Sequence, residues 1–238
     1  MKLDILAFGA HPDDVEISAS GTIAKHVKGG KTAGIVDLTR GELGTRGNAD
    51  LRLEEAKQSA KILGLAAREN LGLADGFFMN DKQSQLALVQ VIRKYQPDIV
   101  LANAVTDRHP DHGKAAKLVS DACFLSGLIK VETELDGEKQ KAWRPSAIYH
   151  YIQDRDIKPD FVVDISDYID FKVNSIKAFK SQFYDPDSKE PETAISSKKF
   201  LDSIKERPAE LGRSIGVSYA EGFTVERNLG VNDLFDLI

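Results

Sequence analysis

Two short segments of the chain are dense in histidine and aspartate, and each follows an apolar run of strand length. The first reads Ala10-His11-Pro12-Asp13-Asp14-Val15-Glu16, and the second reads Asp107-Arg108-His109-Pro110-Asp111-His112. Imidazole nitrogens and carboxylate oxygens bind zinc, and three such ligands with a position left for water are typical of a catalytic zinc site. The two segments therefore predict metal-assisted hydrolysis, in which the metal activates water near neutral pH.

The spacing within these segments selects the candidate ligands. His11 and Asp14 lie three residues apart at an expected helix start, so their side chains can point the same way. His112 would reach the same point from the second segment. We therefore expect His11, Asp14 and His112 to bind the metal. Zn²⁺ and Fe²⁺ both accept such ligands, so the sequence leaves the choice between them open.

The remaining groups of the two segments suit proton transfer. Asp13 stands beside a candidate ligand, where a carboxylate that is not itself bound accepts a proton from water as a general base. His109 would protonate a leaving amine or stabilise an oxyanion, and Asp111 would fix its tautomer and raise its pKa. Taken alone, Asp13 and Asp14 could simply cap a helix. The pairing of the two segments favours the catalytic interpretation.

The elements that position these segments follow from the hydrophobic pattern of the first half. Apolar runs at residues 3–10, 32–39, 70–74 and 98–102 alternate with helical patterns at 15–29, 50–63, 80–93 and 113–125, the third helix opening on a capping box of Asn80 and Gln83. Four β-α units in succession predict an α/β fold with a Rossmann-like, doubly wound, mostly parallel sheet. The first and fourth strands are usually neighbours in such a sheet, and ligands bind beyond their carboxyl ends. The two segments should therefore face each other.

The second half of the chain is less regular. We expect strands at 147–152 and 161–165, helices at 170–182 and 195–206, a polar excursion at 130–144 and a loop at 184–191. Because a Ser- or Gly-rich linker is missing from the sequence, residues 1–238 are expected to form a single domain with a C-terminal elaboration.

Two arginines are candidates for substrate binding. Arg46 lies in the glycine-rich segment Arg40–Gly47 after the second expected strand, and Arg52 lies just beyond it. Arginine at such a place binds a carboxylate or phosphate with two parallel hydrogen bonds. For Arg52 the alternative is an exposed helix residue that pairs with Glu54 or Glu55.

Composition bounds the class of partner and the compartment. A net charge of -5 gives no electrostatic footprint for nucleic acid or an anionic membrane, so we expect a small-molecule substrate. Cys123 is the single cysteine, which excludes an internal disulfide framework and a thiolate zinc cluster and suits a reducing cytoplasm. The N-terminal apolar run is too short for a signal peptide. These features predict a cytoplasmic protein.

Other features are not assigned to the site. His26 lies in an expected helix and His150 in an expected strand, so both are interpreted as structural. Dinucleotide binding is disfavoured because the first β-α turn carries carboxylates where a pyrophosphate needs glycines and free amides.

The two His- and Asp-rich segments together resemble the paired signatures of the PIG-L/LmbE-like zinc deacetylases. Enzymes of this family remove the acetyl group from N-acetylglucosaminyl compounds. The resemblance implies that the three candidate ligands hold Zn²⁺, that Asp13 is the base, and that His109 is the acid or oxyanion partner with Asp111 behind it.

Further segments resemble the bacillithiol-pathway branch of that family. They are Thr39–Gly47, Ser181–Tyr184 and Gly216–Phe223, so the similarity extends over nearly the whole chain. The branch hydrolyses N-acetylglucosaminyl-malate, which implies that Arg46 and Arg52 bind the malate carboxylates. It also implies a homohexamer.

One position departs from the pattern of the family. Some relatives carry a tyrosine two residues before the first histidine of the second signature, where this chain has Asp107. Tyr184, from the expected loop, or another donor would then help His109 polarise the carbonyl group.

Three alternatives remain at this stage. Two histidines and one carboxylate also form the iron site of non-haem oxygenases, although an oxygenase has no need of a spare base at Asp13. A non-catalytic, metal-dependent sugar-binding protein would use the same ligands. Among hydrolases, the alternative to N-acetylglucosaminyl-malate is another N-acetyl sugar, such as a chitooligosaccharide or a thiol conjugate.

Overall fold

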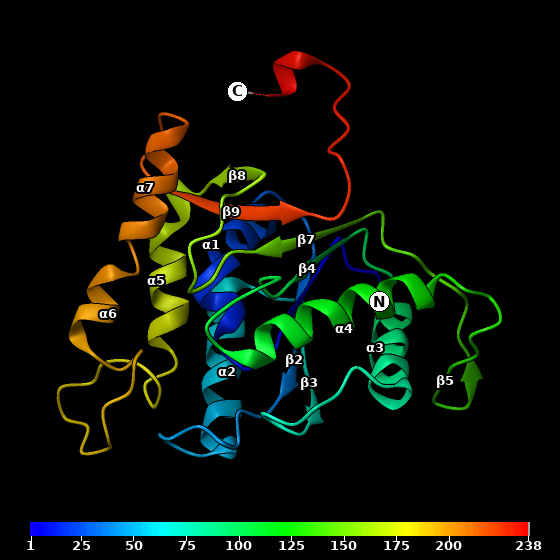
Figure 1. Ribbon diagram of the computed structural model, residues 1–238, viewed down its shortest axis with the longest axis horizontal. Helices are drawn as coiled ribbons and strands as arrows, with labels where there is room; N and C mark the ends of the chain where they lie inside the picture. The colour runs from blue at the N-terminus through cyan, green and yellow to red at the C-terminus, as the bar shows by residue number, and fades with distance from the viewer. Residues whose placement is uncertain (238) are drawn as a thin grey trace.

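A seven-stranded β-sheet forms the centre of the computed structural model, which describes residues 1–237 (Figure 1). The strand order is β3-β2-β1-β4-β7-β9-β8. The strands are β1 (Ile5–Gly9), β2 (Ala33–Thr39), β3 (Ala67–Leu73), β4 (Ile99–Ala102), β7 (Ala147–Tyr151), β8 (Phe161–Asp164) and β9 (Ala220–Val225). Strands β3, β2, β1, β4 and β7 run parallel, and β9 pairs antiparallel with β7 and β8. The predicted α/β fold with a mostly parallel sheet is confirmed.

Helices cover both faces of the sheet (Figure 1). On one face lie α1 (Asp14–Lys28), α2 (Ala49–Leu63) and α5 (Ile169–Lys177), and on the other lie α3 (Lys82–Tyr95) and α4 (Pro110–Ser126). The remaining elements are α6 (Lys198–Ser203), α7 (Glu206–Ser214), the hairpin β5 (Glu134–Leu135) and β6 (Glu138–Lys139), and 3₁₀ turns at Ser166–Tyr168 and Leu234–Asp236. Within residues 1–237, every helix is too short or too polar to cross a membrane.

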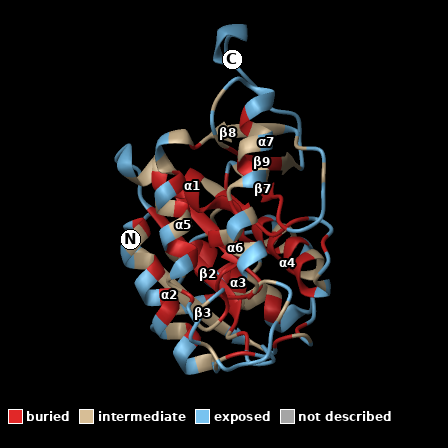
Figure 2. Cartoon of the chain, turned by 90° about the vertical axis from the view of Figure 1, so that its left-hand side faces the viewer, coloured by how far each residue is buried: buried red, intermediate tan, exposed pale blue. Residues whose placement is uncertain are grey.

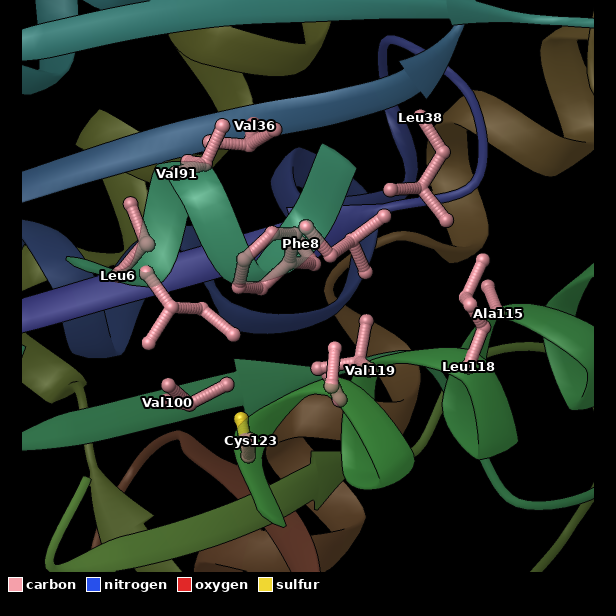
Figure 3. Packing of buried hydrophobic residues seen from close by; sticks show 14 of the residues in the cluster. Leu6, Phe8, Val36, Leu38, Val91, Val100, Ala115, Leu118, Val119 and Cys123 are labelled. Atoms are coloured by element: carbon pink, nitrogen blue, oxygen red, sulfur yellow. The ribbon is translucent and has the colours of Figure 1, made fainter. Parts of the chain in front are cut away.

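The alternation of side chains along β1 explains the two cores. Leu6 and Phe8 face α3 and α4 (Figure 3), whereas Ile5 and Ala7 face α1, as the two-residue period of a strand requires. All five residues of β1 are buried, and the buried positions concentrate along the sheet (Figure 2). A strand covered on both faces reads as a continuous apolar run, which is why β1 could be predicted.

Helix α4 begins three residues earlier than predicted. His109 is its N-cap, and Pro110 occupies the first turn, where proline loses no helical hydrogen bond. The earlier start places Asp111 and His112 in the first turn of the helix, so the helix sets the direction of both side chains.

Several other boundaries differ from the predictions. The cap of α3 is Asp81, whose carboxylate accepts from the Ser84 amide at 2.9 Å, and not Asn80. Strand β3 begins at Ala67, three residues before the expected start, and α5 ends at Lys177. The helix expected at 195–206 is divided into α6 and α7, and the polar excursion contains the β5–β6 hairpin.

Candidate metal centre

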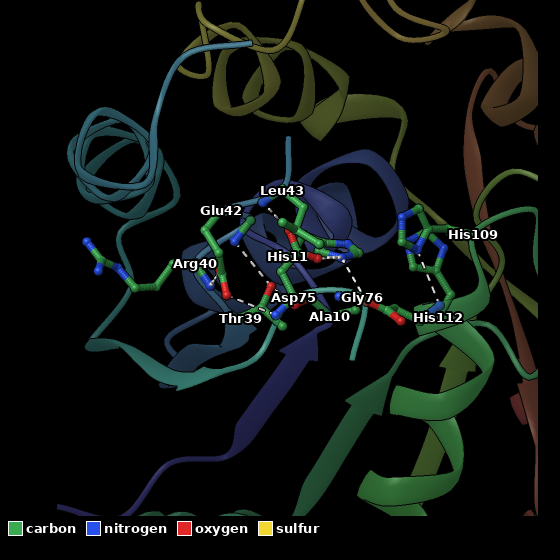
Figure 4. Close-up of polar contacts among 12 residues, drawn as sticks. Ala10, His11, Thr39, Arg40, Glu42, Leu43, Asp75, Gly76, His109 and His112 are labelled. Carbon is green, nitrogen blue, oxygen red and sulfur yellow. Dashed lines mark hydrogen bonds and ion pairs between the residues drawn. The ribbon is translucent and has the colours of Figure 1, made fainter. Parts of the chain in front are cut away.

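The carboxyl ends of β1 and β4 bring the two His- and Asp-rich segments together. The two strands are neighbours, with Ile5 paired to Ile99 and Ala7 paired to Leu101. Beyond them the ring centroid of His109 lies 4.6 Å from that of His11 and 5.2 Å from that of His112. Figure 4 shows His109 and His112 side by side, across from His11. The expectation that these segments face each other is therefore confirmed.

Asp14 lies between two of the histidines. Its Oδ2 is 3.5 Å from His11 Nδ1, and its Oδ1 is 3.2 Å from His112 Nε2. The same two oxygens accept hydrogen bonds from the amides of Asn103 at 3.1 Å and Gln153 at 2.7 Å. Burial acts to raise the pKa of Asp14, but His112 and His11 hold it well below its ordinary range. Asp14 is therefore an ionised carboxylate with both oxygens oriented.

His112 is oriented by a second carboxylate. Its Nδ1 lies 2.5 Å from Asp107 Oδ2, and the other oxygen of Asp107 accepts from the Arg155 amide at 2.8 Å. A histidine that bonds a carboxylate through one nitrogen presents the other to a metal. Burial acts to lower the pKa of His112, but Asp14 and Asp107 raise it to about 9. In this chain Asp107 thus supports His112.

His11 faces two carboxylates that approach it from other elements. Its Nε2 lies 3.0 Å from Asp75 Oδ1 and 3.5 Å from Asp111 Oδ2. Asp75 comes from the turn after β3, and its other oxygen accepts from the Leu43 amide at 2.9 Å (Figure 4). Sequence reasoning missed Asp75, since it is a lone carboxylate outside both segments.

The structure corrects the expected relation between His109 and Asp111. His109 Nδ1 accepts from the Asp111 amide at 3.3 Å, so a neutral His109 carries its proton on Nε2. The Asp111 carboxylate accepts from the Gly76 amide at 2.7 Å and from Lys114 at 3.0 Å. Burial and the neighbouring His11 and His112 lower the pKa of His109, and they outweigh the raising effect of the Asp111 carboxylate. His109 is therefore poised as a neutral N–H donor.

The donor set fits a divalent cation. Ligand atoms of His11, His109 and His112 lie within 4.8 Å of one another, as do those of His11, Asp75 and Asp111. Among the three predicted ligands, Asp14 contacts both His11 and His112. Buried carboxylates here outnumber buried arginine and lysine side chains. Imidazole and carboxylate ligands suit zinc or iron(II). Their other nitrogen and oxygen atoms are held in position by hydrogen bonds to the protein.

Asp13 is held in a strained conformation beside this centre. It is the residue before α1, and its backbone φ is 121°, a value that residues other than glycine rarely adopt. Arg52 donates to Asp13 Oδ2 at 2.7 Å and to the Pro12 carbonyl at 3.0 Å. Burial raises the pKa of Asp13 to about 6, against the lowering effect of Arg52. Its carboxylate is thus held in place and, with a pKa of about 6, is mainly ionised at pH 7.

A network of buried hydrogen bonds and ion pairs also fixes the start of α1. Glu16, which completes the first segment, accepts from Ser59 and Arg68 at 2.5 Å each. Arg68 also donates to both oxygens of Asp37 on β2, at 2.9 and 3.0 Å. This buried network ties α1 to α2, β2 and β3, and Glu16 is structural.

Arg52, one of the predicted substrate contacts, is bonded within the protein. The guanidinium of Arg52 contacts Asp13 and the Pro12 carbonyl, and it does not pair with Glu54 or Glu55. A β-carbon at Gly41, where φ is 65°, would lie 2.3 Å from Arg52 Nη1, so glycine is needed there.

Arg46 is buried under the loop that follows Phe183. It donates to Ser188 Oγ at 2.7 Å, and its Nε lies 3.6 Å from Glu190 Oε2. Tyr184, at the start of that loop, is 38% exposed. Substrate binding by Arg46 and Tyr184 stays a prediction.

Comparison with known proteins adds to this geometry. The family model described as PIG-L, GlcNAc-PI de-N-acetylase, matches residues 6–123. A diacetylchitobiose deacetylase of Thermococcus kodakarensis is 32% identical over 190 residues, which cover 75% of this chain and 70% of that protein. A 4-oxalmesaconate hydratase of Pseudomonas putida is 29% identical over 192 residues, covering 74% and 73%. The crystal structure of the conserved protein TT1542 from Thermus thermophilus has a TM-score of 0.86 and 35% identity, covering 97% of this chain and 98% of that one.

Proposed function

The chain belongs to the PIG-L/LmbE family of deacetylases, and on this premise we propose that it is a zinc-dependent N-deacetylase of N-acetylglucosaminyl-malate. The observation that carries the proposal is the combination of a His–Asp–His donor set with a separate, strained and buried Asp13 held by Arg52. A binding protein or an iron oxygenase has no use for this spare carboxylate. Hydrolysis of an amide needs it, as the acceptor of a proton from water.

The metal ligands in this proposal are His11, Asp14 and His112. A Zn²⁺ held there would supply a Lewis acid that polarises the amide carbonyl and lowers the pKa of water. Asp107 fixes the tautomer of His112, and Asn103 and Gln153 fix the carboxylate of Asp14. The protein thus presents ligand atoms that need little reorganisation.

Asp13 and His109 divide the proton transfers. Asp13 accepts the proton of the attacking water, and its pKa of about 6 lies close to the working pH of a general base. His109, neutral with its proton on Nε2, donates a hydrogen bond to the carbonyl oxygen as negative charge develops there. The proton that Asp13 has accepted then passes to the amide nitrogen, so that the C–N bond breaks, the amine leaves and Asp13 is ionised again. Asp111 acts on His11 and on the turn at Gly76 in this scheme.

The substrate assignment depends on Arg46 and on the resemblance of segments 39–47, 181–184 and 216–223 to the bacillithiol-pathway branch. A buried guanidinium group suits a substrate with carboxylates. N,N'-diacetylchitobiose is the second candidate, because a relative 32% identical to this chain is a diacetylchitobiose deacetylase. We keep two further predictions from the resemblance, that residues 1–238 form one deacetylase domain and that the protein is a homohexamer.

The test is release of acetate and primary amine by the zinc-loaded protein from N-acetylglucosaminyl-malate, N-acetylglucosamine and N,N'-diacetylchitobiose. We expect preference for the malate compound, and loss of turnover in Asp13→Asn with zinc content unchanged. His26→Gln is the matched control, because the ring of His26 bonds the Thr22 carbonyl of its own helix, away from the metal centre. Preference for chitobiose would overturn the substrate assignment. Turnover without acetate release, as in a hydratase, would overturn deacetylation itself.

A further inference from the structure

His150 is buried behind the metal centre and contacts two hydrogen-bond acceptors. It lies on β7 opposite Ala102 of β4, and its side chain is 3% exposed. Its Nδ1 is 2.8 Å from the carbonyl oxygen of Asn103, and its Nε2 is 2.9 Å from Glu226 Oε1. The ring therefore connects the residue after β4 with the residue after β9.

Each of the two contacts requires its own N–H group on the His150 ring. A backbone carbonyl only accepts, and so does an ionised carboxylate, whereas a neutral imidazole has one N–H. The hydrogen bond from His150 lowers the pKa of Glu226, which is thus ionised at neutral pH. Glu226 also faces Ser120 and Lys117 of α4. Protons on both ring nitrogens would satisfy both bonds, and the contact then joins a buried ring to a carboxylate whose side chain is 36% exposed.

Asn103 links this pair to a candidate ligand. Its Nδ2 donates to Asp14 Oδ2 at 3.1 Å, while its Oδ1 is buried without a partner among residues 1–237. The direction of the Asn103 side-chain amide therefore depends on its hydrogen bond to Asp14 and on the position of the Asn103 backbone. The backbone, in turn, is held by His150.

We propose that His150 and Glu226 are a positioning pair that acts through Asn103 to orient the carboxylate of Asp14 for the metal. The same segment carries Gln153, which donates to the other oxygen of Asp14 at 2.7 Å. Residues 150–153 thus reach Oδ1 of Asp14 directly through Gln153 and Oδ2 through Asn103, while the His11 amide also donates to Oδ2 at 2.9 Å. The inference rests on the proposed metal centre and deepens it.

The protonation of His150 is the first test. Long-range ¹⁵N NMR of histidine-labelled protein, metal-free and zinc-loaded, reports the protons on each ring nitrogen. We expect His150 to carry protons on both nitrogens at neutral pH, and Glu226→Gln, whose amide can donate to Nε2, to leave one proton on Nδ1. A singly protonated His150 in the wild-type protein would overturn the proposal.

Zinc affinity, measured by competition with a chelator, is the second test. We expect His150→Phe to weaken zinc binding by up to about tenfold, the lower end of what loss of a direct partner of a metal ligand costs, because His150 acts through Asn103, and Glu226→Gln to weaken it less. His26→Phe is the control with unchanged affinity. Wild-type affinity in a folded His150→Phe overturns the proposal, and if this variant does not fold, the NMR result for Glu226→Gln decides. Failure of the wild-type protein to bind zinc would overturn the metal centre itself.

Discussion

The guanidinium of Arg52 donates to Asp13 Oδ2 at 2.7 Å while its Nε donates to the Pro12 carbonyl at 3.0 Å, in the protein interior. One side chain therefore holds both the carboxylate and the peptide that leads into it. Asp13 needs this support, because a backbone with φ of 121° costs of the order of 1–3 kcal/mol. Arg52 makes a strained arrangement of the proposed base the stable one.

Replacing Arg52 by lysine is expected to lower kcat by roughly 10- to 100-fold, at the lower end of what a general base contributes. Lysine is a point charge and cannot bond Asp13 and Pro12 together. The shorter lysine places its charge farther from the Asp13 carboxylate and weakens the coulombic lowering of its pKa that Arg52 provides, so the acid limb of the kcat/KM profile moves to higher pH. Steady-state kinetics on zinc-loaded protein measure both effects.

Arg40→Lys is the control for that substitution, since Arg40 is a surface residue that pairs with Asp50. Its kinetics should equal those of the wild-type protein. A change in KM alone for Arg52→Lys would contradict the assignment and return Arg52 to the substrate site.

Asp13→Asn is expected to stabilise the metal-free protein at pH 7. The folded-state pKa of Asp13, about 6, lies above the ordinary value of 3.8, so the stability that its protonated form contributes is fully present below pH 3.8 and lost as pH rises through 6. At 1.36 kcal/mol per pKa unit this amounts to roughly 3 kcal/mol. Asparagine remains neutral and tolerates positive φ better.

Urea unfolding of both proteins between pH 4 and pH 8 measures this difference. The gap should shrink towards the acid end and reach its full size above pH 6. An Asp13→Asn variant that is less stable than the wild-type protein at pH 7 would show that the bond to Arg52 outweighs the burial of the charge.

The two His- and Asp-rich segments could be assigned to one site because the assignment needs only local patterns and a topological rule. Apolar runs locate β1 and β4, and neighbouring parallel strands place their carboxyl ends at the same edge. The positions of His11, Asp14 and His112 then follow. The end of α4 that carries His112 was missed only because a proline after a histidine cap extended the helix.

The supporting residues could not be predicted in this way. Asp75, Asn103 and Gln153 contact the site across 64, 89 and 139 residues of sequence, and each is a lone polar residue without a partner at helical or strand spacing. Asn103 had one usable signal, a polar residue directly after a buried strand. The charge of His109 and the partner of Arg52 depend on burial and on neighbours that only the folded chain brings together.

Replacing Lys172 by methionine is expected to destabilise the protein by about 3–5 kcal/mol, as removal of one partner of a buried ion pair does. Lys172 donates to Glu221 Oε1 and to the Ile17 carbonyl of α1, at 2.7 and 2.6 Å. Glu221 in turn accepts from the amides of Gly21 and Thr22 at 3.0 and 2.7 Å. The pair thus bonds backbone groups of helix α1, which carries Asp14.

A double-mutant cycle with Glu221→Gln, followed by urea unfolding, tests this arrangement. The double variant should lose less than the sum of the single variants, because no charge is then left unpaired. Lys139→Met, at an exposed pair with Glu132, is the control and should unfold like the wild-type protein. Additive losses would show that Lys172 and Glu221 act independently.

Glu190→Gln is expected to lower the KM for N-acetylglucosaminyl-malate several-fold and to leave the KM for N-acetylglucosamine unchanged. The Glu190 carboxylate accepts from the Gly47 amide at 2.8 Å and lies 3.6 Å from Arg46 Nε, which has no hydrogen-bond partner among the described residues. It therefore lies where a substrate carboxylate would meet Arg46, and loss of its charge removes a competitor.

Arg46→Gln is the opposing substitution. It should raise the KM for the malate compound by about tenfold or more, since a hydrogen bond to a charged group contributes about 1.5–3 kcal/mol, with kcat little changed, because the contact is equal in the ground and transition states. Steady-state kinetics with both substrates measure the two constants. Equal changes for the malate compound and the plain sugar would assign Arg46 to the support of the 184–191 loop, and would leave the substrate carboxylates to another part of the site.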